Sequence, residues 1–219
     1  MSGRRGLLVL FARAPRLGTV KRRLAREAGD RAALRFHRAM LAALARRLGR
    51  DRRWRTVLAA TPDRARFPSP LPRVAQGRGD LGERMARALA RHRRTVLVGS
   101  DIPGVRAADI ARAFRALDGG AGAVFGPAED GGYWLVGLGP RRPAAPFRGV
   151  RWSGPHALAD TVRNCRGRRV ALVRRLSDVD DAAGLAMWLR GGLRRAGRCP
   201  DPEVRRLRDH RGTPARSRR

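Results

Sequence analysis

The sequence contains only one lysine, Lys21, although 50 of its 219 residues are lysine or arginine. With 18 acidic residues the formal net charge is +32, a value that ordinarily indicates a nucleic-acid or membrane-surface partner. All the remaining residues of this set are arginine. An arginine at a given position therefore says little about the function of that position. The lone lysine indicates a place where a compact ammonium is required and a guanidinium fork is not accepted, with chance retention as the alternative.

Cysteines and long apolar runs are also scarce. Cys165 and Cys199 lie far apart, with no further Cys or His at a metal-ligand spacing, which argues against a zinc site and a disulfide framework. No stretch approaches the roughly 20 apolar residues of a membrane-spanning helix. Arg4-Arg5 before the apolar run 6–12 resembles a twin-arginine signal, but the run is short and suits a buried strand better. These features predict a cytoplasmic protein with reduced thiols and no membrane span.

Aromatic residues make up only 5% of the chain, against 42% hydrophobic residues, so Ala, Leu and Val supply most of the apolar content. Apolar strands alternate with helical periodicity, which predicts one α/β domain, a three-layer sandwich with a mostly parallel central sheet. The expected strands are 7–12, 55–60, 95–99, 123–126, 133–138 and 170–173. The expected helices are 19–47, divided at Gly29-Asp30, and 82–92, 107–117, 155–164 and 181–189.

The folded domain is expected over residues 1–192, because the chain then becomes rich in Gly, Arg and Pro. Residues 193–219 are predicted to form a disordered, Arg-rich tail that binds nucleic acid without specificity. A dedicated nucleic-acid-binding protein is the competing class. It would show aromatic residues interleaved with basic ones or a recognised binding module, and neither is evident in the sequence.

Two segments follow predicted strands at the sheet edge where α/β proteins bind ligands. After strand 7–12, Gly18 lets backbone amides approach an anion, and Arg13 and Lys21 could neutralise phosphate charge. An ordinary strand-to-helix connection with solvated cations is the alternative. After strand 95–99, Asp101 could hold Mg²⁺ on a pyrophosphate, and a helix N-cap or Asx turn would explain it equally well.

A third segment, 126–134, contains two carboxylates and two aromatic rings. Glu129 and Asp130 with Tyr133 and Trp134 predict a second metal ligand beside a stacking surface for a polar substrate. A tight turn at Asp130-Gly131-Gly132 is the alternative interpretation.

The segment Gly77 to Gly82 matches Gly-x-Gly-x-x-Gly, and Asp101 follows about twenty residues later, as in dinucleotide-binding proteins. Three prolines between positions 68 and 72 leave too few residues before the first glycine for a central strand. We therefore expect a loop in which Asp80 caps the following helix and Glu83 completes a capping box, with nicotinamide binding as the remaining alternative.

The histidines, at positions 37, 92, 156 and 210, show no metal-binding spacing and are expected at the surface or at helix ends. A Gly-x-Ser-x-Gly elbow is missing, which argues against a serine hydrolase.

Six short motifs follow one another along residues 7–190: Phe-Ala-Arg-x-Pro-x-x-Gly-x-x-Lys-x-Arg-Leu (11–24), Gln-Gly-x-Gly-Asp-Leu-Gly-Glu-Arg-Met (76–85), Gly-Ser-Asp-Ile-Pro-Gly (99–104), Gly-Pro-Ala-Glu-Asp-Gly-Gly-Tyr (126–133), Trp-Ser (152–153) and Asp-Val-Asp-Asp (178–181). In this order they resemble a bacterial family of GT-A-like transferases related to the nucleotide-diphospho-sugar transferases, often labelled radical-SAM- or selenium-associated transferases. The resemblance implies a GT-A-type nucleotide-binding fold, similar also to the guanylyltransferases of molybdenum-cofactor and phospholactate metabolism.

Carried over by position, the resemblance implies three groups of site residues. The nucleotide would contact Arg13, Gly18, Lys21, Asp80, Leu81 and Gly82. Asp101, with Asp130, would hold Mg²⁺ or Mn²⁺, and the acceptor side would comprise Glu129, Asp130, Tyr133, Trp134, Trp152 and Ser153. Two departures are visible, since the usual Trp-Ser-Thr is Trp152-Ser153-Gly154 here and Asp101-Ile102-Pro103 lacks the second Asp of an Asp-x-Asp motif.

Together these features predict a metal-dependent transferase that uses an activated nucleotide. Glycosyl transfer from a nucleotide sugar to a small-molecule acceptor is the leading hypothesis, because carboxylates beside Tyr133 and Trp134 suit a sugar or polyol. Glu129 or Asp130 would orient or deprotonate the acceptor hydroxyl. Nucleotidyl transfer from a nucleoside triphosphate, with release of pyrophosphate, is the alternative.

Overall fold

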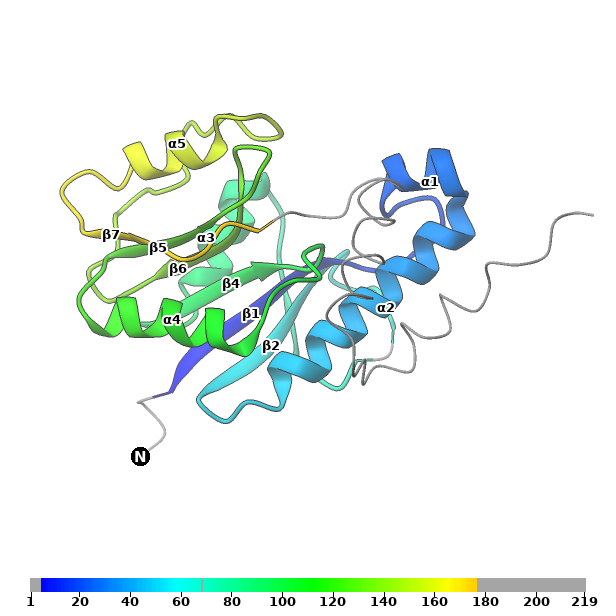
Figure 1. Ribbon diagram of the computed structural model, residues 1–219, viewed down its shortest axis with the longest axis horizontal. Helices are drawn as coiled ribbons and strands as arrows, with labels where there is room; N and C mark the ends of the chain where they lie inside the picture. The colour runs from blue at the N-terminus through cyan, green and yellow to red at the C-terminus, as the bar shows by residue number, and fades with distance from the viewer. Residues whose placement is uncertain (1–4, 68, 177–219) are drawn as a thin grey trace, which may run out of the picture.

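The computed structural model describes residues 5–67 and 69–176 of the chain (Figure 1). Within this part, seven strands form one sheet in the order β3-β2-β1-β4-β6-β5-β7. Neighbouring strands are parallel except for β6, which runs antiparallel to β4 and β5. The strands are β1 (Gly6–Arg13), β2 (Trp54–Thr61), β3 (Arg73–Ala75), β4 (Thr95–Gly99), β5 (Ala123–Pro127), β6 (Tyr133–Leu138) and β7 (Val170–Leu172).

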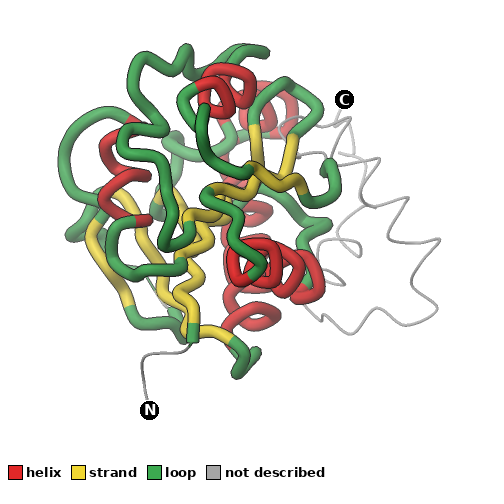
Figure 2. The backbone as a smooth tube through the Cα atoms, turned by 90° about the vertical axis from the view of Figure 1, so that its left-hand side faces the viewer, coloured by secondary structure: helices red, strands yellow, loops and turns green. Residues whose placement is uncertain are grey.

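Helices cover both faces of this sheet. The helices of the described part are α1 (Arg22–Ala28), α2 (Asp30–Gly49), α3 (Leu81–Leu89), α4 (Ala107–Asp118) and α5 (Ala157–Arg163). Buried side chains from residues 41–48 of α2 share one core cluster with those of α4, and the buried side chains of α3 share the other with residues of α5. Figure 2, turned by 90°, shows helical segments on both sides of the strands. The predicted three-layer α/β fold with a mostly parallel sheet is confirmed.

The central strand β1 is covered on both faces, which explains why its sequence is an unbroken apolar run. Leu8 and Leu10 belong to the core under α2 and α4, whereas Leu7 and Val9 belong to the core under α3 and α5. Side chains alternate across a strand, so a strand covered on both faces buries every residue. Complete burial of each of these side chains stabilises the fold by about 1.5–3 kcal/mol.

Several expected element boundaries shift in the structure. The helical stretch begins at Arg22 and not at residue 19, and it is interrupted at Gly29, whose φ is 83°, as predicted. Strand β3 was not predicted, because three residues at the sheet edge give no periodic pattern. The helix expected over 181–189 and the tail expected from residue 193 lie outside the described residues. Among the helices that are described, none has the length and apolarity needed to cross a membrane.

The carboxyl ends of β1 and β4 lie side by side. Phe11 pairs with Gly99 in the parallel ladder, so the residues that follow each strand emerge together at one edge of the sheet. Figure 1 shows α1 and the first part of α2 projecting beyond this edge. A separate apolar cluster, made by Leu24, Ala33, Phe36 and Met40, holds α1 against α2.

The turn between β5 and β6 packs against the segment that leads into α5. Gly131 has a φ of 83°, and a Cβ at this position would lie 2.3 Å from the carbonyl oxygen of Pro155. The Leu158 amide donates to the Gly131 carbonyl at 3.1 Å. Glycine is therefore required here by both backbone conformation and close approach.

We expect Gly131→Ala to lower the free energy of unfolding by about 1–3 kcal/mol, because the new methyl group overlaps the Pro155 backbone and adopts a left-handed φ. Gly154→Ala is the matched control, since nothing lies within 4 Å of a Cβ there and its φ is not positive. Denaturant unfolding compares the two variants. Equal stabilities would contradict the packing of this turn.

Candidate active site

Asp101 lies two residues after the end of β4, and three side chains converge on its Oδ1. Lys21 Nζ lies 3.4 Å away, His37 Nδ1 lies 3.6 Å away, and the Ser100 hydroxyl donates at 3.3 Å. The carboxylate is 44% exposed, and all three of these contacts are made by Oδ1. The exposed part of the carboxylate can therefore reach a ligand.

The Asp101 carboxyl is ionised at neutral pH. Burial acts to raise its pKa, but the contact with His37 and the charge of Lys21 outweigh burial and lower the pKa to about 2. Asp101 does not cap α4, which begins at Ala107 after Arg106. The helix-cap interpretation of Asp101 is therefore wrong, and a charged carboxylate stands at the ligand-binding edge of the sheet.

Lys21 lies inside this cluster, with a side chain that is only 3% exposed. It is the residue before α1, and its backbone has φ 49° and ψ 52°, a left-handed conformation uncommon for a residue with a Cβ. Such a conformation costs about 1–3 kcal/mol and persists where the surrounding structure imposes it. The sole lysine is therefore a buried neighbour of Asp101 and not one of the many solvated cations.

His37 is a member of the cluster that the sequence interpretation placed at the surface, and that prediction is wrong. It lies on α2 and is 2% exposed. Its Nε2 is 2.9 Å from the Arg13 carbonyl oxygen, and because a carbonyl only accepts, Nε2 carries the hydrogen. Its position four residues from both Ala33 and Leu41, on the buried face of α2, is the signal that could have found it.

The loop between β1 and α1 is tied to the cluster at both ends. The Arg13 carbonyl accepts from His37, while the exposed Arg13 guanidinium donates to the Thr19 carbonyl at 3.4 Å. Gly18 has a φ of 72° and open space where a Cβ would stand. The structure therefore brings Arg13, Gly18 and Lys21 to the edge that carries Asp101.

Two arginines from distant segments fix the loop that follows Asp101. Arg47 of α2 donates to two carbonyl oxygens within 103–105, at 3.2 and 2.7 Å. Arg174, after β7, donates to the third carbonyl at 2.6 Å and forms a bidentate pair with Asp109 at 2.7 Å. Sequence reasoning could not separate these two structural arginines from the solvated ones.

The segment from Gly77 to Gly82 forms the start of α3. The Asp80 carboxylate accepts from the Glu83 amide at 2.8 Å, and the Glu83 carboxylate accepts from the Asp80 amide at 2.9 Å, so the predicted capping box is confirmed. The preceding strand is the three-residue edge strand β3, whereas a dinucleotide fingerprint follows a central strand. The nicotinamide alternative is therefore not supported.

Leu81 is the first residue of α3 and is partly buried. A Cβ at Gly82, the next residue, would lie 3.2 Å from the ring of Trp152. The structure thus joins a predicted nucleotide-side residue to a predicted acceptor-side residue. Ser153, next to that ring, is exposed and has a φ of 62°.

Glu129 and Asp130 lie in the β5–β6 turn, at the same sheet edge as Asp101, because β6 runs antiparallel to β4. Both are exposed. Asp130 Oδ1 accepts from the Gly132 amide at 2.9 Å, which is the tight-turn interaction. In residues 5–67 and 69–176 no three His, Cys, Asp or Glu side chains gather in a way that could hold a metal ion. These residues therefore do not form a metal cage made of protein alone.

Tyr133 and Trp134 do not form one stacking surface, because consecutive residues of β6 point to opposite faces. Tyr133 is partly buried, packs edge-on against Phe125 with 5.3 Å between ring centroids, and lies 3.4 Å from the Thr161 hydroxyl. Burial raises the pKa of Tyr133 well above its usual range. Trp134 is 3% exposed, and its Nε1 donates to the Arg174 carbonyl at 3.2 Å. The Trp134 ring belongs to the core and offers no face to a substrate.

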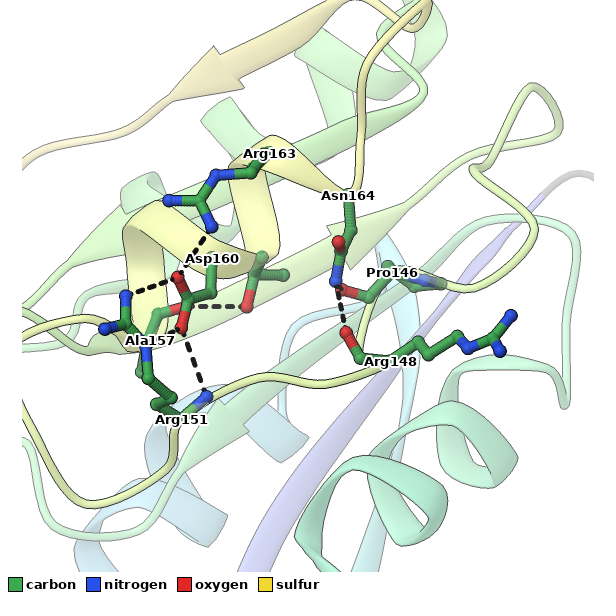
Figure 3. A network of polar contacts seen from close by, with 8 residues as sticks. Pro146, Arg148, Arg151, Ala157, Asp160, Arg163 and Asn164 are labelled. Carbon is green, nitrogen blue, oxygen red and sulfur yellow. Dashed lines mark hydrogen bonds and ion pairs between the residues drawn. The ribbon is translucent and has the colours of Figure 1, made fainter.

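A polar network fixes the loop that leads to Trp152 (Figure 3). The buried Asp160 carboxylate accepts from the Arg151 amide at 3.2 Å and from its guanidinium at 2.9 Å twice. Arg163 adds a contact with Asp160 at 3.2 Å. Asn164 donates to two carbonyl oxygens of the same loop, at 3.0 and 2.8 Å. The α5 helix thereby positions the Trp152-Ser153 pair.

Residues 14–154 match a family model described as "Uncharacterized protein conserved in bacteria (DUF2064)". This span covers more than half of the 219 residues. The chain belongs to the DUF2064 family. No curated protein matches it.

Solved structures share the fold of this DUF2064 protein. A protein of Desulfovibrio desulfuricans G20, provisionally assigned as a nucleotide-diphospho-sugar transferase, matches with a TM-score of 0.84 and 28% identity over 93% of this chain and 94% of that chain. The 4-diphosphocytidyl-2C-methyl-D-erythritol synthase of Anaerococcus prevotii DSM 20548 matches with a TM-score of 0.53 and 10% identity over 84% and 96%. The first of these matches supports a relation to the nucleotide-diphospho-sugar transferases in general. Neither match concerns the narrower relation to guanylyltransferases.

The side chains around Asp101 of the DUF2064 protein suit a divalent metal that is also coordinated by oxygen atoms of a bound ligand. Mg²⁺ takes one or two carboxylates and completes its shell with phosphate oxygens and waters. Asp101 supplies an ionised, partly exposed carboxylate, and Lys21 lies beside it to offset phosphate charge. This donor set suits Mg²⁺ or Mn²⁺ held between Asp101 and a phosphate chain.

We expect Asp160→Asn to lower the melting temperature at neutral pH. The hydrogen bonds of Arg151 hold the pKa of the Asp160 carboxyl well below its usual range. A lowered pKa in the folded state stabilises the protein at pH values above the ordinary aspartate pKa of about 3.9. This contribution is lost progressively as the pH falls below about 3.9. The difference from the wild type should therefore be large at pH 7 and shrink below about pH 4.

Asp118→Asn is the matched control, because the Asp118 carboxylate pairs with Arg94 at an exposed position and contributes little. Thermal melting from pH 3 to pH 7 measures both variants. A difference for Asp160→Asn that does not change with pH would contradict the assigned ion pair.

Proposed function

We propose that this protein transfers a glycosyl group from a nucleotide-diphospho-sugar to a hydroxyl of a small-molecule acceptor, with Mg²⁺ or Mn²⁺ on the diphosphate. The observation that carries the proposal is the ionised Asp101 carboxylate at the end of β4, with Lys21 buried beside it. The likeness to a provisionally assigned nucleotide-diphospho-sugar transferase, at 28% identity and a TM-score of 0.84, supports a transferase that uses a nucleotide.

In this proposal, the residues at the ends of β1 and β4 bind the diphosphate. Asp101 holds the metal, which supplies positive charge to the departing diphosphate. Lys21 and Arg13 add further positive charge, and the open backbone at Gly18 lets the phosphates approach. The start of α3, with Asp80, Leu81 and Gly82, lies on the nucleoside side.

The transfer forms a bond from the acceptor oxygen to the anomeric carbon and breaks the bond from that carbon to the diphosphate oxygen. The nucleoside diphosphate leaves with the electron pair, and the hydroxyl proton passes to a carboxylate. We assign this base to Glu129, because Asp130 already accepts from the backbone of its own turn. Tyr133, Trp152 and Ser153 line the acceptor side. Such catalysis relies on positioning and charge stabilisation.

Nucleotidyl transfer is the second candidate function. The lone Asp101, without a second Asp two residues later, favours it, since it matches a metal shared with a triphosphate. In that reaction the acceptor oxygen attacks the α-phosphorus, and pyrophosphate leaves. The leaving group distinguishes the two reactions even when the acceptor is unidentified.

Incubation with individual nucleotide sugars and nucleoside triphosphates, each with Mn²⁺, tests the proposal through slow transfer to water. We expect a nucleoside diphosphate to be released from one nucleotide sugar, with a rate about 100-fold lower in Asp101→Asn because a charged group of the site is lost. Pyrophosphate from a triphosphate, with every nucleotide sugar intact, would establish nucleotidyl transfer instead. Release of neither product would contradict both reactions.

We expect Lys21→Arg to weaken nucleotide binding about tenfold although it preserves charge, because a planar guanidinium cannot occupy the position of a compact ammonium. The buried side chain and its 3.4 Å contact with Asp101 leave little freedom for a larger group. Arg16→Lys, an exposed change in the same loop, is the control. Calorimetric titration measures both variants, and wild-type affinity in Lys21→Arg would show that the lysine is retained by chance.

A further inference from the structure

His37 is a buried polar side chain to which the proposed reaction assigns no role. Its imidazole is 2% exposed, and Nδ1 has no hydrogen-bond partner within the described residues. A buried polar atom without a partner costs free energy, and neighbouring buried positions of α2, such as Leu41 and Leu44, are filled by apolar side chains. A histidine at this position therefore needs a reason other than packing.

The two ring nitrogens face two different parts of the site. Nε2 donates to the Arg13 carbonyl at 2.9 Å, which anchors the ring to the end of β1. Nδ1 points at Asp101 Oδ1, 3.6 Å away, after β4. The imidazole ring thus lies between the end of β1 and the Asp101 carboxylate, which follows the parallel neighbour β4.

Lys21 also contacts Asp101 Oδ1, but its side chain is less firmly fixed than that of His37. Its ammonium stands on a flexible four-carbon stem and can turn toward a phosphate, whereas the imidazole is held at Nε2. If a nucleotide draws the ammonium away, His37 and the Ser100 hydroxyl remain beside Oδ1, at 3.6 and 3.3 Å. His37 is also held at Nε2, so the orientation of the carboxylate would then depend mainly on His37.

We propose that His37, with a hydrogen on each ring nitrogen, is a positioning residue whose Nδ1–H holds Asp101 Oδ1 and so presents Oδ2 to the metal. This inference rests on the proposed function, because it assigns the metal to Asp101. Groups behind a metal ligand orient that ligand, and their loss typically weakens metal affinity by about 10–100-fold. His37 acts through Asp101 and does not itself touch the ion.

Two substitutions separate the two ends of the ring. An asparagine side chain reaches about as far as imidazole Nδ1, so His37→Asn keeps a polar atom toward Asp101 and gives up the Arg13 contact. A glutamine reaches about as far as Nε2, so His37→Gln keeps the Arg13 contact and gives up the one to Asp101. Glutamine is also the better helix former, so a simple loss of helix stability would harm His37→Asn more.

The experiment titrates Mn²⁺ by electron paramagnetic resonance in the presence of whichever of UDP, GDP, ADP or CDP the wild-type protein binds most tightly. Thermal melting of the same samples reports stability separately. We expect His37→Asn to bind Mn²⁺ nearly as the wild type does, and His37→Gln to bind it about tenfold more weakly or worse, as Asp101→Asn does.

Wild-type affinity in both His37 variants would overturn this inference and leave the proposed function intact. An equal loss in both, following their melting temperatures, would show a structural role only and would also overturn it. A loss confined to His37→Asn would place the effect at Arg13 and contradict the role at Asp101. If the wild type binds no Mn²⁺ with any of the nucleotides, the proposed function itself fails.

Discussion

The contact of Lys21 with Asp101 Oδ1 is the interaction on which the candidate site depends. At 3.4 Å, it joins the start of α1 to the end of β4, segments that are far apart in the sequence. The contact is possible because β1 and β4 are parallel neighbours whose carboxyl ends emerge at one edge. The site is therefore a product of strand order, and Arg47 and Arg174 preserve it by fixing the loop that follows Asp101.

Features with a local physical cause could be predicted from the sequence. The apolar run of β1 identifies a strand buried on both faces, because no other use of such a run fits its length. The capping box of Asp80 and Glu83 follows from residue types at a fixed spacing. The prediction that Lys21 and Asp101 serve one edge followed from the rule that ligands bind at the carboxyl ends of parallel strands, and the structure brings the two residues into contact.

Features that depend on tertiary placement could not be predicted. The spacing of His37 from Ala33 and Leu41 indicates burial, but only the structure shows that its partners are Arg13 and Asp101. Tyr133 and Trp134 are adjacent aromatic residues that the sequence does not distinguish. Because consecutive residues of a strand point to opposite faces, Trp134 lies in the core and cannot share a surface with Tyr133. Arg174 is indistinguishable from dozens of other arginines until its bidentate pair with Asp109 is seen.

The proposed reaction requires Asp101 and Lys21 to bind a metal-bound nucleotide at the carboxyl edge of the sheet. Crystals grown with Mn²⁺ and a nucleoside diphosphate test it through the anomalous scattering of manganese. We expect a peak about 2.1 Å from Asp101 Oδ2, with the diphosphate between that peak and Lys21. An anomalous peak and nucleotide density away from Asp101 would contradict it.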